Sequence, residues 1–356
     1  MTFRIEGGSC VKRVTLSVIV PVFNGEAYID RAMKGILSQT LHELEVIVVN
    51  DGSTDCSLQK LKKWSEQDAR VILVDKENEG VSIARNLGMS KASGKYLTFL
   101  DVDDYLEPDA YERMVDSLEK SGSQATLCSF FSEYKDEIEQ VLLPWETGTV
   151  LTKKEIWEQL IPWMIKVYPE DGISTNIFGS VWRLCVSQEA WKMAGVEFDP
   201  KLHIAEDFDF CIRLYSKLEK ISIIKEPLYH YIRWENTTLA VYRKNQFQEG
   251  IDNQMRLKHF LEEEGKYEQL KKRFVGSYVD VCIGSLVNFV RPGAPPKKQV
   301  RKELKSVVEQ IATSPLQSEF SKQPLTRNQK LVLWLIKRKW VRLILLLTEI
   351  RQKRKG

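Results

Sequence analysis

The chain has 356 residues, of which 43% are apolar, and carries 52 lysines and arginines against 49 aspartates and glutamates. This composition is typical of a globular protein that is long enough to bury a sizeable core. The six cysteines are widely separated, which excludes a zinc site of closely spaced thiolates and indicates a reducing compartment. The first ten residues lack the apolar core of a signal peptide, so we expect none.

Strand and helix patterns alternate through the first hundred or so residues. Between the predicted strands, apolar residues at helical spacing predict one helix from about Ala27, a second ending near Gln67 and a third opening at Gly80. Such alternation predicts an α/β fold with a mainly parallel sheet flanked by helices. It would place Asp51 and Asp103 at one sheet edge, where open α/β sheets bind ligands. The predicted strands are residues 15–22, 44–49, 71–74 and 96–100.

Three carboxylates, Asp101, Asp103 and Asp104, follow the last of these strands. Clustered carboxylates repel one another unless a cation neutralises them, and hard oxygen ligands suit Mg²⁺ or Mn²⁺. One alternative is that these acids cap the next helix, where aspartate is favoured. A calcium loop is excluded, because Tyr105 and Leu106 stand where that loop needs an oxygen ligand and a glycine.

Four motifs occur in one order along this region. They are Val20-Pro21-Val22-Phe23-Asn24, Asn50-Asp51-Gly52-Ser53-Thr54-Asp55, Gly80-Val81-Ser82-Ile83-Ala84-Arg85-Asn86 and Asp101-Val102-Asp103-Asp104. Together they resemble family 2 glycosyltransferases of the GT-A fold, of the inverting, bacterial surface or exopolysaccharide type. The resemblance spans about the first third of the chain and continues more loosely through Asp207 to Arg233. Neither a Gly-x-Gly-x-x-Gly nor a Gly-Lys-Ser/Thr loop follows the first strand, which argues against Rossmann dehydrogenases and P-loop enzymes.

The resemblance implies a nucleotide-sugar site. Asp51 would accept a hydrogen bond from the uracil ring of a UDP-sugar, because a carboxylate suits an N–H donor. Arg85 would meet phosphate charge as a forked donor, with a surface ion pair as the alternative. Asp103 would bind Mn²⁺ or Mg²⁺ directly, with Asp101 nearer the ribose or a metal-bound water. The other residues implied to shape the nucleotide pocket are Pro21, Val22 and Asn24.

A second acidic segment, Glu206-Asp207, precedes an apolar helix about a hundred residues after the first. It resembles the family's Glu-Asp motif, which implies that Asp207 is the general base acting on the acceptor hydroxyl. The alternative is a helix cap. His230 and Arg233 lie where the family places groups that reach the diphosphate or metal, although Ile232 interrupts the usual pattern. A strand histidine satisfied by the backbone is the alternative for His230.

The carboxyl-terminal tail is strongly basic, with eleven lysines and arginines and one glutamate over residues 322–356. Two apolar segments, 331–336 and 340–347, flank the cluster Lys337-Arg338-Lys339, and these cations argue against a membrane-spanning helix. A helix lying in an anionic membrane surface fits better. The alternative is an amphipathic helix packed on the protein. No recognisable module supports nucleic acid binding.

These patterns predict a domain organisation. We expect a GT-A glycosyltransferase domain over residues 1–242, with a nucleotide-sugar half at about 14–132 and an acceptor half at about 133–242. A helical extension over 243–320 and the basic amphipathic tail over 321–356 would follow. The protein would be cytoplasmic and peripheral on the inner face of the cell membrane.

The resemblance implies a metal-dependent, inverting transfer of a sugar from a nucleotide-diphosphate donor to a glycan or polyprenyl-linked glycan, with no organic cofactor. The alternative is a catalytically silent, membrane-associated protein that binds a sugar nucleotide or a glycan. The presence of Asp51, Asp101, Asp103 and Asp207 together argues against this alternative, because a silent copy could lose them freely.

Overall fold

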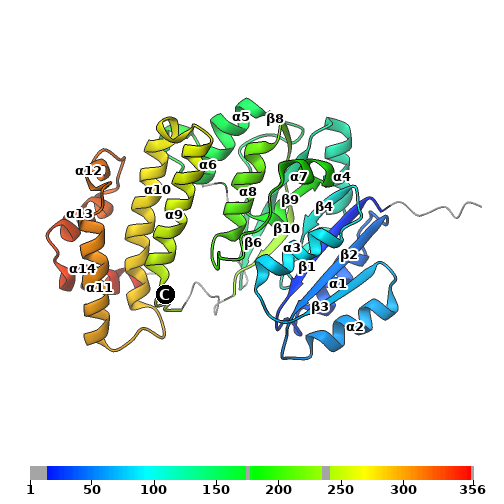
Figure 1. Ribbon diagram of the computed structural model, residues 1–356, viewed down its shortest axis with the longest axis horizontal. Helices are drawn as coiled ribbons and strands as arrows, with labels where there is room; N and C mark the ends of the chain where they lie inside the picture. Colours follow the sequence, from blue (N-terminus) through cyan, green and yellow to red (C-terminus); the bar gives the residue numbers. More distant parts are fainter. Residues whose placement is uncertain (1–13, 136, 174–176, 178, 235–240, 354–356) are drawn as a thin grey trace, which may run out of the picture. The chain divides into compact units, whose positions relative to one another are not determined.

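The computed structural model (Figure 1) describes residues 14–135, 137–173, 177, 179–234 and 241–353. The chain divides into two compact units, each described separately below. Unit 1 takes in the chain as far as Ile156 together with Gly179–Ile232, and unit 2 takes in Trp157–Phe178 and the chain from Arg233 onward. The predicted domain boundaries stay predictions, because compactness alone does not define an independently folding domain.

Unit 1 is built on a mixed sheet of ten strands. They are β1 (Leu16–Val22), β2 (Leu44–Asp51), β3 (Val71–Lys76), β4 (Tyr96–Phe99), β5 (Tyr105–Leu106), β6 (Ala125–Tyr134), β7 (Glu137–Val141), β8 (Val150–Thr152), β9 (Leu184–Ser187) and β10 (Lys220–Ile232). Their order is β3-β2-β1-β4-β9-β6-β10-β5, with β7 beside β6 and β8 beside β10 (Figure 1). β1 to β4 form a parallel block, β6 and β10 are also parallel, and β9 is antiparallel between β4 and β6. The expected α/β sheet is confirmed.

The register of the parallel block aligns the carboxyl ends of its strands. Val22 at the end of β1 lies opposite Asn50 of β2, and Asp51 lies opposite Lys76 of β3. Pro21 lies past Ile19, the last β1 residue that pairs with β4, as expected for a residue without an N–H near a strand end. The loops that carry the predicted site residues therefore leave the sheet from one edge.

Helices cover both faces of this sheet, because alternate strand residues point to opposite sides. On one face Val18 belongs to a core that includes Met33 of α1 and Met114 of α4. On the other face Ile47 packs with Ala84 of α3. The helices of unit 1 are α1 (Ile29–Leu37), α2 (Ser57–Gln67), α3 (Val81–Lys91), α4 (Ala110–Ser121), α5 (Lys153–Glu155), α7 (Gln188–Ala194) and α8 (Glu206–Lys217), with a 3₁₀ turn at Val181–Arg183.

Unit 2 is helical, and α10 is its central element. α10 packs against α6, α9, α12, α13 and α14. With the 3₁₀ turn Asn288–Val290 it is long and apolar enough to cross a membrane, but 61% of its most apolar window is buried in the protein, as in a core helix. The predicted interruption at residues 291–296 is confirmed as a turn before α11. The helices are α6 (Ile161–Ile165), α9 (Gln246–Glu263), α10 (Tyr267–Val287), α11 (Lys297–Ala312), α12 (Gln317–Phe320), α13 (Arg327–Lys337) and α14 (Val341–Lys353); a π-helical turn, Ile156–Leu160, precedes α6 and a 3₁₀ turn, Pro169–Asp171, follows it.

The basic tail forms two helices, α13 and α14, rather than a single helix. They contact each other, α10 and α11, and they bury the apolar side chains of Leu335, Ile336, Ile344 and Leu345. The tail thus packs in part on the protein, which is the alternative that its sequence left open. Other large apolar side chains of the same helices stay exposed. Residues 354–356 of the predicted tail lie outside the described residues.

Candidate active site

The loop after β1 is fastened to the loop after β2 by Asn24. Its amide oxygen accepts hydrogen bonds from the backbone N–H of Thr54 at 2.8 Å and from the Thr54 hydroxyl at 3.3 Å, and its own backbone N–H donates to the Ser53 hydroxyl at 3.0 Å. The residue has a positive φ of 51°, which asparagine tolerates better than most side chains. Pro21 and Val22 end β1 just before this loop, so the structure brings these three predicted residues to the sheet edge.

Asp51 is a buried carboxylate that anchors the loop between β3 and α3. One oxygen accepts from the Lys76 ammonium at 2.7 Å and from the Glu79 N–H at 3.0 Å, and the other accepts from the Gly80 N–H at 2.8 Å. A carboxylate offers about four acceptor positions, so one more donor can be accommodated. The predicted contact with a uracil N–H therefore stays compatible with the carboxylate's structural bonds.

Arg85, on α3, joins three carboxylates from two distant parts of the sequence. Its terminal nitrogens lie 2.9 Å from Asp101, 2.6 Å from Asp207 and 3.3 Å from Glu206. The guanidinium is buried, so the alternative of a surface ion pair is wrong. Burial alone would lower the pKa of Arg85, but the three carboxylates outweigh it and raise the pKa, so the side chain stays charged. Contact with a phosphate stays a prediction, and it requires this arginine to share or exchange a partner.

Asp207 lies in the first turn of α8 and does not cap the helix. The N-cap position is Ala205, which has a φ of 62° and makes no side-chain capping bond. The carboxylate of Asp207 instead pairs with Arg85 and accepts a backbone hydrogen bond from Val181. Desolvation raises the pKa of Asp207 to about 7, although the charge of Arg85 acts to lower it. The N-cap part of the alternative is therefore wrong, whereas the acidic residues it expects in the first turn are present as Glu206, Asp207 and Asp209.

The acids after β4 have different environments. Asp104 is buried, and its oxygens accept from the Tyr229 hydroxyl at 2.7 Å and from the Ile232 N–H at 2.8 Å, which fastens the loop to β10. Burial, together with the charges of Asp101 and Asp103, raises the pKa of Asp104 to about 8. Asp101 and Asp103 are less buried, and both remain at the sheet edge. None of the three caps α4, whose N-cap is another residue further along the chain.

The carboxylate oxygens of the loop after β4 are ligands that suit a divalent cation. Within the part of the chain that the structure describes, no group of three His, Cys, Asp or Glu side chains is placed to hold a metal ion. Mg²⁺ in phosphate-transfer sites is held by one or two carboxylates together with substrate phosphates rather than by an all-protein cage. Asp101 and Asp103 supply two such oxygen donors, and a cation beside them would reduce the repulsion among these clustered carboxylates. The residues therefore fit a metal whose remaining ligands come from substrate or water.

His230 belongs to a separate cluster that its sequence context does not reveal. Its Nδ1 lies 2.6 Å from Glu133 and its Nε2 lies 2.9 Å from Glu107, so the ring faces carboxylates on both sides. The imidazole is also stacked between the rings of Tyr105 and Phe131, with centroids 4.1 and 4.5 Å away. His230 is thus satisfied by side chains rather than by the backbone. A contact of His230 with the diphosphate or the metal stays a prediction.

Comparison with known proteins agrees with this geometry. A family model described as Glycosyl transferase family 2 matches residues 17–168. The chain is 28% identical over 349 residues to the uncharacterized glycosyltransferase EpsJ of Bacillus subtilis, covering 96% of this chain and 97% of EpsJ. It is 30% identical over 233 residues to an uncharacterized glycosyltransferase of Haemophilus influenzae, covering 65% of this chain and 69% of that protein.

The fold is also similar to that of a solved protein. The crystal structure of Staphylococcus aureus TarS 1–349 in complex with UDP matches with a TM-score of 0.57 and 16% identity, over 96% of this chain and 92% of that one. The likeness at this identity shows a shared fold. The family model and the sequence relatives match the part of the chain that carries the four motifs. This chain therefore belongs to glycosyl transferase family 2 and is a glycosyltransferase.

Proposed function

We propose that this enzyme transfers a sugar from a UDP-sugar to an acceptor hydroxyl with inversion, and that Asp207 is the general base. One observation carries the proposal. The buried Arg85 holds both Asp101, from the predicted donor site, and Asp207, from the predicted base motif, within 2.9 Å. This network links the predicted base to a predicted donor-site carboxylate within unit 1, which supports a direct displacement between donor and acceptor.

The donor assignment rests on the edge residues of the parallel block. Asp51 keeps one acceptor position for an N–H of the nucleobase, while Pro21, Val22 and Asn24 would line the base and ribose. The fold relative TarS of S. aureus has been solved with UDP and with UDP-GlcNAc. This supports a uridine nucleotide as the donor class without identifying the sugar.

We further propose that Asp101 and Asp103 hold Mn²⁺ or Mg²⁺ when the donor binds. Such a cation supplies positive charge to the leaving diphosphate. Arg85 keeps the carboxylate of Asp101 oriented, which makes it a positioning residue in this scheme. Asp104 holds the loop to β10 through Tyr229 and so fixes where the two outer carboxylates lie.

In the proposed displacement, Asp207 is the base. The acceptor oxygen attacks the anomeric carbon as its proton passes to the Asp207 carboxylate, and the nucleoside diphosphate leaves from the opposite side. One attack of this kind inverts the anomeric centre, so an α-linked donor gives a β-linked product. Because burial brings the pKa of Asp207 to about 7, the group would be well matched to take up a proton near neutral pH.

For the acceptor we propose a glycan or a lipid-linked glycan used in bacterial surface polysaccharide synthesis, with the enzyme peripheral on the inner face of the cell membrane. Exposed cations and large apolar side chains on α13 and α14 support this location. The alternative, a silent protein that binds sugar nucleotides or glycans, would keep donor binding but show no turnover.

Calorimetric titration tests the donor assignment. UDP-, GDP- and dTDP-sugars are titrated with and without Mn²⁺ into the protein and into Asp103→Ala. We expect binding of a UDP-sugar that depends on Mn²⁺ and is lost in Asp103→Ala. Asp116→Ala is the matched control, because this aspartate is exposed and pairs with Lys120 on α4. Binding that does not need the metal, or binding that survives Asp103→Ala, would contradict the assignment.

A further inference from the structure

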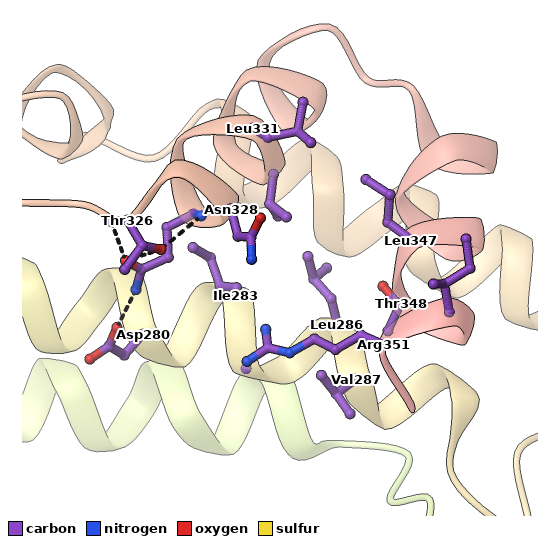
Figure 2. Close-up of a pocket in the computed structure, with 14 residues that line it drawn as sticks. Asp280, Ile283, Leu286, Val287, Thr326, Asn328, Leu331, Leu347, Thr348 and Arg351 are labelled. Carbon is purple, nitrogen blue, oxygen red and sulfur yellow. Dashed lines mark hydrogen bonds between the residues drawn. The ribbon is translucent and has the colours of Figure 1, made fainter. Parts of the chain in front are cut away.

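Unit 2 contains a pocket of about 660 Å³ between α10, α13 and α14, which we call the C-terminal pocket (Figure 2). Figure 2 shows Ile283 and Leu286 of α10 pointing into the space that Leu331 of α13 and Leu347 of α14 also border. Half of its lining residues are large and apolar. They are Ile283, Leu286, Val287, Leu331, Val332, Leu347 and Ile350.

One end of the C-terminal pocket is polar but already satisfied. The Gln329 side-chain nitrogen donates to Asp280 at 3.1 Å, and its oxygen accepts from the Thr326 backbone N–H at 2.9 Å. Asp280 also forms an ion pair with Lys166. The polar side chains at this end therefore need no ligand to complete their hydrogen bonds.

Arg351 is the cation of the pocket lining. Figure 2 shows its side chain extending from α14 across α10, beside Leu286 and Val287. Among the described residues it has no acidic partner, since the acid of the pocket lining, Asp280, is held by Lys166 and Gln329. A guanidinium beside an apolar cavity matches a ligand with a hydrocarbon chain and an anionic group.

The C-terminal pocket opens onto an exposed apolar surface of the same two helices. Leu331 and Ile350 line the pocket and are also 44% and 41% exposed, so they form its rim. We call this the α13–α14 surface. Its large exposed side chains are Leu331 and Trp334 of α13, Trp340 between the two helices, and Leu343, Leu346 and Ile350 of α14.

The same two helices also carry exposed cations. Lys330, Lys337 and Arg342 are exposed and have no acidic partner among the described residues, whereas Lys339 pairs with Glu309 at 2.7 Å. Tryptophan and leucine beside lysine and arginine are the composition of helices that lie in an anionic membrane interface. A second copy of this chain would instead bring like charges together.

We propose that the α13–α14 surface lies on an anionic phospholipid bilayer and that the C-terminal pocket takes one acyl chain of a phospholipid, whose phosphate contacts Arg351. Leu331 and Ile350 belong both to the pocket lining and to the exposed surface, so they offer an apolar entry for the chain. This inference adds a lipid site in unit 2 and requires no catalytic turnover, while its membrane location rests on the proposed function.

The test uses a substitution that fills the pocket. Gly284 lines it, and a Cβ built there meets nothing within 4 Å, so the backbone accepts a side chain at this position and Gly284→Leu is designed to fill the cavity. Gly284→Ala is the matched control, because it makes the same gain in helix propensity with little filling. If Gly284→Leu fails to fold, Leu347→Phe fills the pocket from α14.

The probe is phosphatidylglycerol with a photoreactive acyl chain, in phosphatidylcholine vesicles with and without further phosphatidylglycerol. We expect binding only to the anionic vesicles and cross-links on α10 near Ile283. Gly284→Leu should lose most of these α10 cross-links, whereas Gly284→Ala should keep them. Arg351→Gln should bind the vesicles about fivefold more weakly, the loss expected for one cation at an anionic surface.

Three results would overturn the proposal. α10 cross-links that persist in folded Gly284→Leu would show that the chain lies elsewhere. Equal binding to neutral vesicles, or none to anionic ones, would remove the membrane partner. A dimer in light scattering that is lost in Trp334→Ala would assign the surface to a second copy. Calorimetric titration of the donor with the same variants separates these results from failure of the transfer mechanism, since donor binding should be unchanged.

Discussion

The sheet edge of unit 1 and the carboxyl-terminal helices of unit 2 use charge in opposite ways. At the sheet edge, the buried Arg85 is paired with the partly buried carboxylates of Asp101 and Asp207 at 2.6 to 2.9 Å. On α13 and α14, cations such as Lys330 and Arg342 are exposed without acidic partners in the described chain.

This difference separates two kinds of functional charge. Desolvated, paired groups are oriented in advance and have shifted pKa values, which suits proton transfer. Exposed, unpaired cations gain little from the fold and favour an anionic partner outside the protein. Burial and pairing thus indicate which charges serve chemistry and which serve association.

The largest expected effect is on transfer by Asp207→Asn. Loss of the general base should lower the rate of transfer about 10² to 10⁴-fold, while the affinity for the donor changes little. Asp209→Asn is the matched control, since Asp209 lies on the same turn of α8 and pairs with Arg213. Release of UDP measures the rate and calorimetry measures the affinity. An active Asp207→Asn, or one that no longer binds donor, would remove this residue from the role of base.

Arg85→Ala should have the largest effect on stability. It leaves partly buried carboxylates without their cation, and breaking a buried pair in this way costs about 3 to 5 kcal/mol of unfolding free energy. Urea unfolding followed by circular dichroism measures the loss. A change below about 1 kcal/mol, the range of exposed pairs, would show that the network is not buried in solution. Arg342→Ala, which removes an exposed cation, is the control.

Unit 2 also contains a partly buried ion pair, between Asp171 and Arg273, that can be compared with the paired charges of unit 1. The Arg273 hydrogen bonds lower the pKa of Asp171 from 3.8 to about 2. Because the folded pKa is depressed, the pair stabilises the protein above about pH 4, and this contribution is lost as the pH falls from about 4 to about 2. Asp171→Asn should therefore cost about 2 kcal/mol at pH 7 and remove that acid-dependent loss. Unfolding at pH 7 and pH 3 in both proteins measures it.

The pH dependence of transfer tests the protonation state of Asp207. Asp207 acts as a base only when ionised, and burial raises its pKa to about 7. The rate should therefore rise about tenfold per pH unit below 7 and level off above it. Arg85→Gln removes the charge that lowers this pKa, so its profile should shift to higher pH. A rate that is flat between pH 5 and pH 8, or a profile unchanged in Arg85→Gln, would contradict the assignment.

Much of the parallel block can be predicted from local patterns in the sequence. Apolar runs and helix spacing predict β1 to β4 and the helices between them, because each element is specified by residues near one another in the chain. The common edge of Asp51 and the Asp101–Asp104 loop follows from right-handed parallel connections. The division of the tail into two helices is not predicted, because it depends on how α13 and α14 pack against α10.

The partners of the site residues depend on contacts between distant segments. Arg85 and Asp207 are far apart in sequence, and no local pattern indicates that they form an ion pair. Tyr229 likewise holds Asp104 across 125 positions of the chain. A tyrosine in the apolar strand β10 resembles any core residue until the neighbouring strands are known.

The measurement that tests the central claim most directly is the stereochemistry of slow sugar transfer to water from an α-linked UDP-sugar, followed by proton NMR. Water replaces the acceptor, so the unknown glycan is not needed. Asp207-assisted inversion predicts that the β-anomer of the free sugar forms first and that Asp207→Asn forms it far more slowly. First formation of the α-anomer, or an equal rate in Asp207→Asn, would contradict the proposed mechanism.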